Sequence, residues 1–338
     1  MLTPPVLFLI FNRPDTTARV FEAIRAARPS RLYVAADGPR AGRPGEVERC
    51  EEARHIATAV DWPCEVKVLF RNQNLGCGRA VFEAISWFFE NEPEGIILED
   101  DILPDPTFFA YCAELLERYR EDRRVMAVCG GGYGDPERFG DASYTFARVF
   151  DPWGWASWRR AWEKHDAAAL GKLDVSKRLL NRIGPWGFDS GAYWRGQFGL
   201  VTNGAVDTWD YPWMFSIFKG RGLVAFPASN LISNLGFRAD ATHTLPLANG
   251  ERSHNAERPT FALSSPLLHP RHVRNNYGYE MDFYTRRLGR TRMSPIGILQ
   301  LAAQRKIAAA RAKVSPLIPA QFKAQLRAWR ARRAATSN

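Results

Sequence analysis

The chain has 338 residues, of which 46% are hydrophobic and 24% charged, a composition typical of a globular protein with a sizeable core. No apolar run approaches the roughly 18 residues of a spanning helix, and the short run 6–11 lacks the basic segment and cleavage site of a signal peptide. We therefore expect a cytoplasmic protein. Five scattered cysteines without CxxC spacing indicate reduced thiols and argue against a disulfide framework or a zinc site.

The net charge of +10 is unevenly distributed along the chain. No Asp or Glu follows Asp282, and the last 56 residues hold 13 Lys and Arg. The first 282 residues hold 33 Lys and Arg against 36 Asp and Glu, a balance of −3. A slightly acidic body with a strongly basic tail predicts an anionic partner for the tail.

The first 128 residues alternate between short apolar runs and longer amphipathic ones. The runs typical of buried strands are 6–11, 31–36, 65–70, 96–98 and 125–128, and the helix candidates are 16–27, 45–60, 80–90 and 106–120. This alternation predicts an α/β fold, Rossmann-like, with a mostly parallel central sheet and helices on both faces.

The pattern changes after residue 128. Residues 130–245 are rich in glycine and aromatic residues, and eight of the 11 tryptophans lie between Trp153 and Trp213. We expect short strands and helices built over the edge of the sheet, and a helical segment from Ser294 onward. The predicted organisation is a first half of one domain (1–128), a second half of the same domain (129–282), and a basic helical tail (283–338).

Three acidic residues, Glu99, Asp100 and Asp101, directly follow the apolar run 96–98. Adjacent carboxylates repel one another, so they need a cation or hydrogen-bond donors, and a hard divalent ion is a natural partner that also holds phosphates. The simpler alternative is an acidic turn before a helix that Asp105 caps and Pro106 begins.

Other polar residues also follow predicted strands. Asn12 and Arg13 come after the first strand, and Asp37 after the second. The carboxyl ends of parallel strands share one edge of a sheet, where such folds bind ligands, so these side chains should converge with the acidic triplet. Alone, Asp37-Gly38 would be a plain turn.

Several motifs are absent. The sequence has no G-x-G-x-x-G after the first strand, no G-x-x-x-x-G-K-[ST] and no G-x-S-x-G. Dinucleotide-binding, P-loop and nucleophile-elbow interpretations therefore lose their main support. An α/β sheet without these glycine-rich cradles can hold phosphates through a metal on carboxylates.

The chain resembles a GT-A glycosyltransferase, and more narrowly the N-acetylglucosaminyltransferase I type and its bacterial relatives. The resemblance is carried by six segments: VLFLIFNRP (6–14), VAADG (34–38), ILEDDILPDPTFF (97–109), PWGWASWRRAW (152–162), WDYPW (209–213) and NLGFRADATH (234–243). It implies a GT-A fold and a nucleotide-sugar donor.

The resemblance also implies roles in the donor site. Asp101 would hold Mn²⁺ (or Mg²⁺) that bridges the diphosphate of a UDP-sugar, Asp100 would contact the ribose, and Glu99 the donor sugar. Asp37 would contact uracil, with Arg13 and Asn12 in the same site. The family has a histidine near the position of His243, which implies a metal or diphosphate contact; a surface histidine in a polar loop is the alternative.

Aromatic side chains suit a sugar acceptor, because rings stack on the apolar faces of sugars. Trp153, Gly154, Trp155 and Trp209 are the acceptor-site candidates, whereas Trp158 and Trp162 fit a helical core stripe. A carboxylate among aromatic residues has a raised pKa and suits a general base. The resemblance implies that this base is Asp210, with Asp207 as its rival and a structural cap as the alternative.

The basic tail places Phe322, Leu326 and Trp329 on one predicted helix face among Lys and Arg residues. Such a helix suits an anionic membrane surface, and no DNA or RNA module accompanies it, so nucleic acid is not expected; a solvated tail is the alternative.

The predicted function is an inverting, metal-dependent glycosyltransferase, acting in surface polysaccharide or glycoconjugate synthesis at the inner face of the membrane. It would move a sugar from a UDP-sugar to a glycan or lipid-linked acceptor. The alternatives are a sugar-nucleotide nucleotidyltransferase and a non-catalytic carbohydrate-binding protein at the membrane.

Overall fold

A computed structural model describes residues 2–166, 184–185, 187–237, 255–294, 296–297, 299 and 303. The chain divides into two compact units, Met1–Pro185 with Asp189–Arg290, and Trp186–Phe188 with Thr291–Asn338. All helices and strands named below belong to the first unit. His243 and most of the predicted tail helix lie outside the described residues, so the metal contact of His243 and the membrane contact of the tail stay predictions.

An eight-stranded sheet forms the centre of the first unit, in the order β3-β2-β1-β4-β8-β6-β9-β7. Its strands are β1 (Val6–Ile10), β2 (Arg31–Ala36), β3 (Glu65–Phe70), β4 (Glu94–Glu99), β6 (Val125–Cys129), β7 (Tyr144–Ala147), β8 (Trp155–Trp158) and β9 (Leu223–Pro227). Neighbouring strands from β3 to β4 run parallel, as do β6 and β9, whereas β8 and β7 run antiparallel to their neighbours. The predicted α/β class with a mostly parallel sheet, GT-A-like in type, is confirmed.

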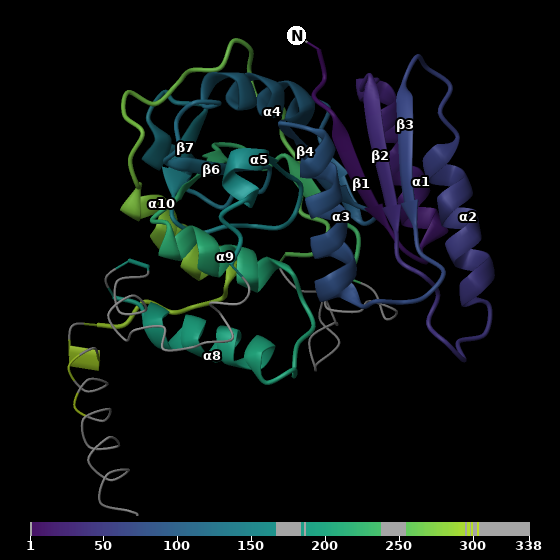
Figure 1. Ribbon diagram of the computed structural model, residues 1–338. Helices are drawn as coiled ribbons and strands as arrows, with labels where there is room; N and C mark the ends of the chain where they lie inside the picture. The colour runs from purple at the N-terminus through teal and green to yellow at the C-terminus, as the bar shows by residue number, and fades with distance from the viewer. Residues whose placement is uncertain are drawn as a thin grey trace, which may run out of the picture. The chain divides into compact units, whose positions relative to one another are not determined.

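Helices α1 (Pro14–Ala27), α2 (Glu46–Thr58) and α4 (Thr107–Arg118) cover one face of this sheet. Phe8 and Leu98 of the strands share a hydrophobic core with Val20 of α1, Ala53 of α2 and Leu115 of α4. Figure 1 shows α1 and α2 next to each other beside β1 to β3. Because successive strand residues point to opposite faces, β1 is buried at all five positions and needs a second layer of helices.

Helices α3 (Cys77–Asn91), α5 (Arg159–Trp162) and α9 (Asp210–Lys219) supply that second layer. Tyr33 of β2 packs edge-on against Phe88 of α3, with ring centroids 5.0 Å apart. Trp155 of β8 contacts Trp162 and Trp213. The stripe predicted for α3 is confirmed, because its members Ala84, Ile85, Phe88 and Phe89 are buried.

The tryptophans at 155, 158 and 162 are core residues, but their expected helical stripe is wrong. Trp155 and Trp158 lie on β8, and the helix begins at Arg159. Pairing of β8 with both β4 and β6 overrides the local helical spacing. The same pairing inserts a strand from the second half of the chain into the sheet begun by the first half.

A two-stranded antiparallel sheet joins β5 (Ile102–Pro104), directly after the acidic triplet, to β10 (Ile232–Asn234). The other elements are the 3-10 turn η1 (Pro136–Phe139), helices α8 (Ser190–Thr202) and α10 (Tyr277–Asp282), and the π-helical turn η2 (Phe283–Arg287). Within the described residues, no helix combines the length and apolarity required to span a membrane.

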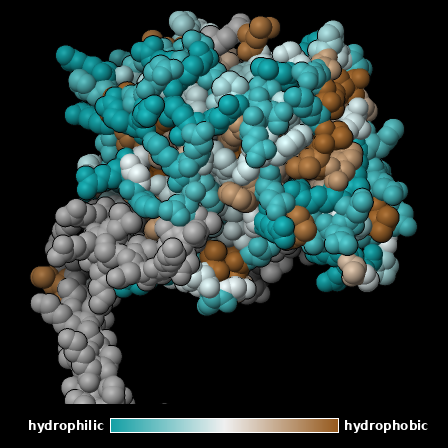
Figure 2. Space-filling model, in the orientation of Figure 1, coloured by the Kyte–Doolittle hydropathy of each residue, from teal (hydrophilic) through white to brown (hydrophobic). Residues whose placement is uncertain are grey.

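Figure 2 shows a face that is mostly hydrophilic, with hydrophobic atoms gathered near the β3 edge of the sheet. Val66 and Val68 of this edge strand are exposed. Lys67 lies between them, and a charge on a short edge strand opposes pairing with another chain.

Candidate active site

The site lies where the strand order reverses. β2 and β4 flank β1 on opposite sides, and open α/β sheets bind ligands at such a switch point, beyond the carboxyl ends of the strands. A cavity of about 420 Å³ opens there, within the size range of small-molecule sites. Nine predicted residues line it: Arg13, Asp37, Glu99, Asp100, Asp101, Trp153, Asp207, Trp209 and Asp210. The structure thus brings them together, while the role of each stays a prediction.

Arg13 joins the loop after β1 to the acids after β4. Its two terminal nitrogens donate to Asp100 Oδ1 (2.5 Å) and Asp101 Oδ2 (2.7 Å). Burial opposes the charge of Arg13, but the charges of Asp100 and Asp101 more than offset this and raise its pKa. The Arg13 side chain is 22% exposed and Asp100 only 2%, so this ion pair is largely shielded from water.

Asp101 is positioned by the small second sheet. The N–H of Leu235 donates to the Asp101 carbonyl at 2.8 Å, next to the β5–β10 pairing. A Cβ on Gly236 would lie only 2.0 Å from Asp101 Oδ2. The absence of a side chain at Gly236 therefore leaves the room in which the Asp101 carboxylate sits.

The acidic triplet carries more negative charge than Arg13 balances. Burial, followed by the charges of Asp101 and Asp100, raises the pKa of Glu99 to about 8. Burial also raises the pKa of Asp100 to about 6, against the opposing charge of Arg13. A cation near these oxygens would relieve both shifts.

The donor set fits a divalent cation only if other ligands complete it. Within the described residues, no group of three or more His, Cys, Asp or Glu side chains is placed to hold a metal. Mg²⁺ commonly takes one or two carboxylates and fills its remaining positions with phosphate oxygens and water. Asp101 with its acidic neighbours fits that arrangement once a diphosphate is bound.

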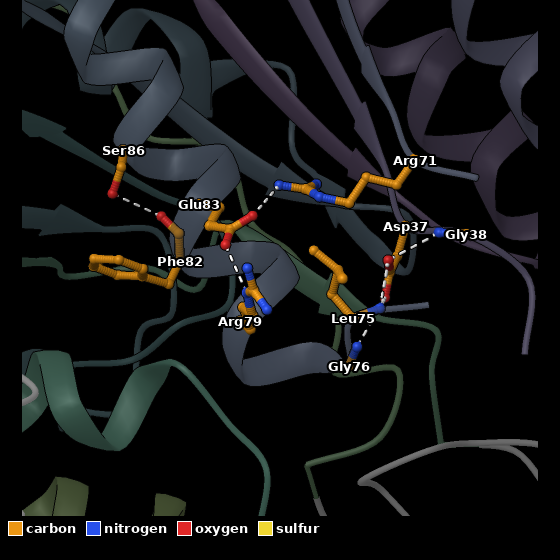
Figure 3. A network of polar contacts seen from close by, with 9 residues as sticks. All are labelled: Asp37, Gly38, Arg71, Leu75, Gly76, Arg79, Phe82, Glu83 and Ser86. Carbon is orange, nitrogen blue, oxygen red and sulfur yellow. Dashed lines mark hydrogen bonds and ion pairs between the residues drawn. The ribbon is translucent and has the colours of Figure 1, made fainter. Parts of the chain in front are cut away.

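Asp37 is hydrogen-bonded to a neighbouring loop. Its carboxylate accepts from the N–H groups of Gly38 (2.9 Å), Leu75 (3.0 Å) and Gly76 (3.1 Å) (Figure 3). Figure 3 also shows Arg71, which lines the cavity, bound to Glu83 of α3 at 3.0 Å. Asp37 therefore holds the loop before α3, and the predicted uracil contact would have to share these oxygens.

Asn12 faces away from the cavity lining. Its Nδ2 donates to Glu46 Oε1 at 2.7 Å, and Glu46 is fully buried. Arg40 donates to the same carboxylate at 2.6 Å, and its hydrogen bonds and charge outweigh burial to lower the pKa of Glu46. Arg40 also lies over the ring of Phe11, so Asn12 supports two cavity residues that the sequence did not single out.

Asp210 is the first residue of α9 and a wall of the cavity. Its Oδ1 accepts from the Thr208 hydroxyl (2.5 Å) and the Tyr211 N–H (2.9 Å). Burial raises the pKa of Asp210, and these two hydrogen bonds oppose the rise. A raised pKa at a fixed position is what a general base needs.

Asp207, the rival, is at the N-terminus of another helix. Its Oδ1 accepts from the N–H of Gly78 at 3.1 Å, and a Cβ on Gly76 would lie 2.4 Å from its Oδ2. An anion at the positive end of α3 is stabilising. This position accounts for the Asp207 carboxylate without a catalytic role.

The four acceptor-site candidates fall into two groups. Trp153 and Trp209 line the cavity. Trp155 is fully buried, stacked on Trp209 with centroids 5.5 Å apart, so it supports Trp209 and has no surface for a sugar. Gly154 has φ +61° and a Cβ there would meet Ile232 at 2.4 Å, which makes its role one of backbone shape.

The sequence also left out several lining residues. Arg40, Arg71, Asn74 and Cys77 line the same cavity. Arg71 and Asn74 directly follow β3, so the rule that selected Asn12 and Asp37 would have found them. Arg287, which stacks on Trp153 with 3.8 Å from its guanidinium carbon to the ring centroid, gave no local signal.

No protein-family model matches the chain, and no curated protein matches it by sequence. Among solved structures, HddC from Yersinia pseudotuberculosis is 12% identical, over 46% of this chain and 77% of that one, with a TM-score of 0.28. UDP-glucose pyrophosphorylase in complex with UDP-glucose is 10% identical (44% and 63%, TM-score 0.25). The inositol-1-phosphate CTP transferase from T. maritima is 12% identical (48% and 74%, TM-score 0.27). None of the three is described as a glycosyltransferase, and likenesses this distant carry no argument about activity.

Proposed function

We propose that the chain is an inverting glycosyltransferase that moves a sugar from a UDP-sugar to a hydroxyl of a glycan or lipid-linked acceptor. The observation that carries the proposal is the composition of one cavity. Arg13 and the acids Glu99–Asp101 form one wall at the switch point, and Asp210 stands on another beside Trp209 and Trp153. Groups for a charged diphosphate and a base for an acceptor hydroxyl thus share one space.

The diphosphate would bind at the wall that holds Arg13. The guanidinium presents a planar fork of donors suited to phosphate oxygens. Asp101 and its acidic neighbours would hold Mn²⁺ or Mg²⁺ through carboxylate oxygens. When bound, the cation supplies Lewis acidity that stabilises the charge on the departing UDP.

Transfer would be a single displacement. The acceptor O–H gives its proton to Asp210, its oxygen bonds to the anomeric carbon, and the bond from that carbon to the phosphate oxygen breaks with its electron pair leaving on UDP. Burial around Asp210 favours proton uptake, and the hydrogen bonds from Thr208 and Tyr211 hold the carboxylate in place.

The alternative is a nucleotidyltransferase that makes the activated sugar. Three arginines line the cavity, Arg13, Arg40 and Arg71, and a triphosphate would need positive charge of this kind. Each of the three is paired with a carboxylate of the protein, which leaves less charge for a triphosphate.

One pair of assays separates the two functions. UDP release from a panel of UDP-sugars with Mn²⁺ supports the transferase. Pyrophosphate release from UTP and a sugar 1-phosphate, with no UDP release from UDP-sugars, would instead establish the nucleotidyltransferase.

A further inference from the structure

A second cavity, of about 210 Å³, adjoins the donor cavity. Asp210 and Pro152 line both cavities, so they form the wall between them. Tyr193 of α8, Tyr211 of α9, and Arg287 with Leu288 at the end of η2 line the second cavity. No sequence motif pointed to this space, because its lining comes from three elements that are far apart in the chain.

Arg287 is held rigidly at this cavity. Its Nε donates to Asp151 Oδ1 at 3.0 Å, and Asp151 is fully buried and accepts from the Tyr133 hydroxyl at 2.7 Å. The guanidinium carbon lies 3.8 Å from the centroid of the Trp153 ring. Within the described residues its hydrogen bonds use Nε alone, which leaves the terminal N–H groups for a ligand.

We infer that the second cavity is the acceptor subsite and that it takes one uncharged sugar unit through its hydroxyl groups. This inference rests on the proposed function and adds the substrate class of its acceptor. A hydroxyl of a sugar in the second cavity would meet Asp210 from the side opposite the donor. The wall shared by the two cavities is thus where the proton would be transferred.

The size of the cavity limits the ligand to a single unit. Ligand pockets commonly measure about 300–1,000 Å³. The second cavity is smaller than that range, so it fits the terminal sugar of an acceptor while the remainder of a glycan or lipid extends away.

The charges at the cavity favour a neutral sugar. Asp151 balances the positive charge of Arg287, and Asp210 adds a negative charge to the same lining. A sugar carboxylate or phosphate would meet Asp210 without a free cation among the side chains that line the cavity. Hydroxyl groups, in contrast, can accept from Arg287 and exchange hydrogen bonds with Tyr193 and Tyr211.

The first test fills the cavity without touching Asp210. Leu288→Trp should raise the acceptor KM, or abolish transfer, while the affinity for UDP and the slow transfer of donor sugar to water stay unchanged. Leu200→Trp is the matched control, because Leu200 is exposed on α8 and lines neither cavity. Equal acceptor kinetics in Leu288→Trp and wild type would overturn the inference.

The second test measures the ligand directly. Methyl glycosides of glucose, galactose, mannose and N-acetylglucosamine, and methyl glucuronide, are titrated into the protein with UDP and Mn²⁺. At least one neutral glycoside should bind about tenfold or more tightly than the glucuronide, and Tyr193→Phe and Arg287→Lys should weaken it about tenfold without changing UDP affinity. Tighter binding of the glucuronide, or binding of no glycoside, would overturn the inference.

These results separate the inference from the proposed function. If UDP-sugars neither bind nor release UDP in the wild-type protein, the glycosyltransferase itself is excluded. If they do both while Leu288→Trp behaves as the wild type, the function stands and only the subsite is wrong.

Discussion

The guanidinium of Arg13 lies 2.7 Å from the carboxylate of Asp101, 88 residues further along the chain. This contact ties the end of β1 to the end of β4 at the centre of the candidate site. A diphosphate or a cation that approaches Asp101 must therefore join or replace the Arg13 contact. The pair links the structural and the proposed catalytic properties of the site, and the first prediction concerns it.

Arg13→Met should destabilise the protein by about 3 kcal/mol, because it leaves two shielded carboxylates without their cation. Arg13→Lys should recover part of this loss, since an ammonium cannot bridge both acids with a planar fork. Urea unfolding followed by circular dichroism measures the difference. Arg79→Met, at an exposed ion pair, is the control and should cost less than about 1 kcal/mol.

Asp101→Ala should remove the effect of Mn²⁺ on UDP binding. The side chain supplies the proposed cation contact, so calorimetric titration of UDP should give one affinity with and without metal. Asp105→Ala is the control, because Asp105 accepts from Thr107 at the start of α4 and should affect stability only. Undiminished metal-dependent binding in Asp101→Ala would refute the assignment.

Asp210→Asn should bind the donor normally and lose transfer by a factor of about 100 or more, since an amide cannot accept the proton. In the wild type, transfer should decline as the pH falls through the pKa of Asp210. Burial raises that pKa above its ordinary value, so the decline should begin at a higher pH than for an exposed aspartate. Asp207→Asn, tested by the same donor-binding and pH-rate measurements, should retain transfer; retained transfer in Asp210→Asn would exclude it as the base.

Asp37→Asn should weaken UDP, CDP and ADP by similar factors. Asp37 accepts three backbone N–H groups, two of them in the loop before α3, so its loss should loosen one wall of the cavity for every nucleotide. If Asp37 instead recognises uracil, the variant should lose affinity for UDP alone. Titration of the three nucleotides decides, with Asp61→Asn on the surface as the control.

His165 should make the fold sensitive to acid. Its ring packs against Phe82, Trp162 and Trp213, and burial lowers its pKa to about 4. The unfolded chain takes up this proton near pH 6.5, so between pH 6.5 and 4 the unfolded state binds more protons and the free energy of unfolding falls as pH falls.

His165→Phe should therefore be less destabilised than wild type when the pH drops from 7 to 4.5, by less than about 3 kcal/mol because the ring is partly exposed. Urea unfolding at both pH values measures this. His55→Phe, at an exposed position of α2, is the control; the same pH dependence in His165→Phe and wild type would contradict the assignment.

Local patterns determined the first half of the fold. Strands β2 and β3 have the predicted bounds, because a short buried run between turn residues leaves few alternatives. The same patterns placed polar residues after β1, β2 and β4. Since parallel strands end at one edge, the sequence alone predicted that Arg13, Asp37 and Asp101 would line one space.

Only the tertiary structure decided what each of these side chains contacts. Asp37 and Asp207 accept backbone N–H groups of the segment around α3, and Asn12 turns to Glu46, because buried polar groups take whichever partners the packing supplies. The second cavity depends on α8, α9 and η2 meeting at Asp210. Periodicity records which face of an element is buried, but pairings between distant segments, such as β8 with β4 or Arg287 with Asp151, leave no local trace in the chain.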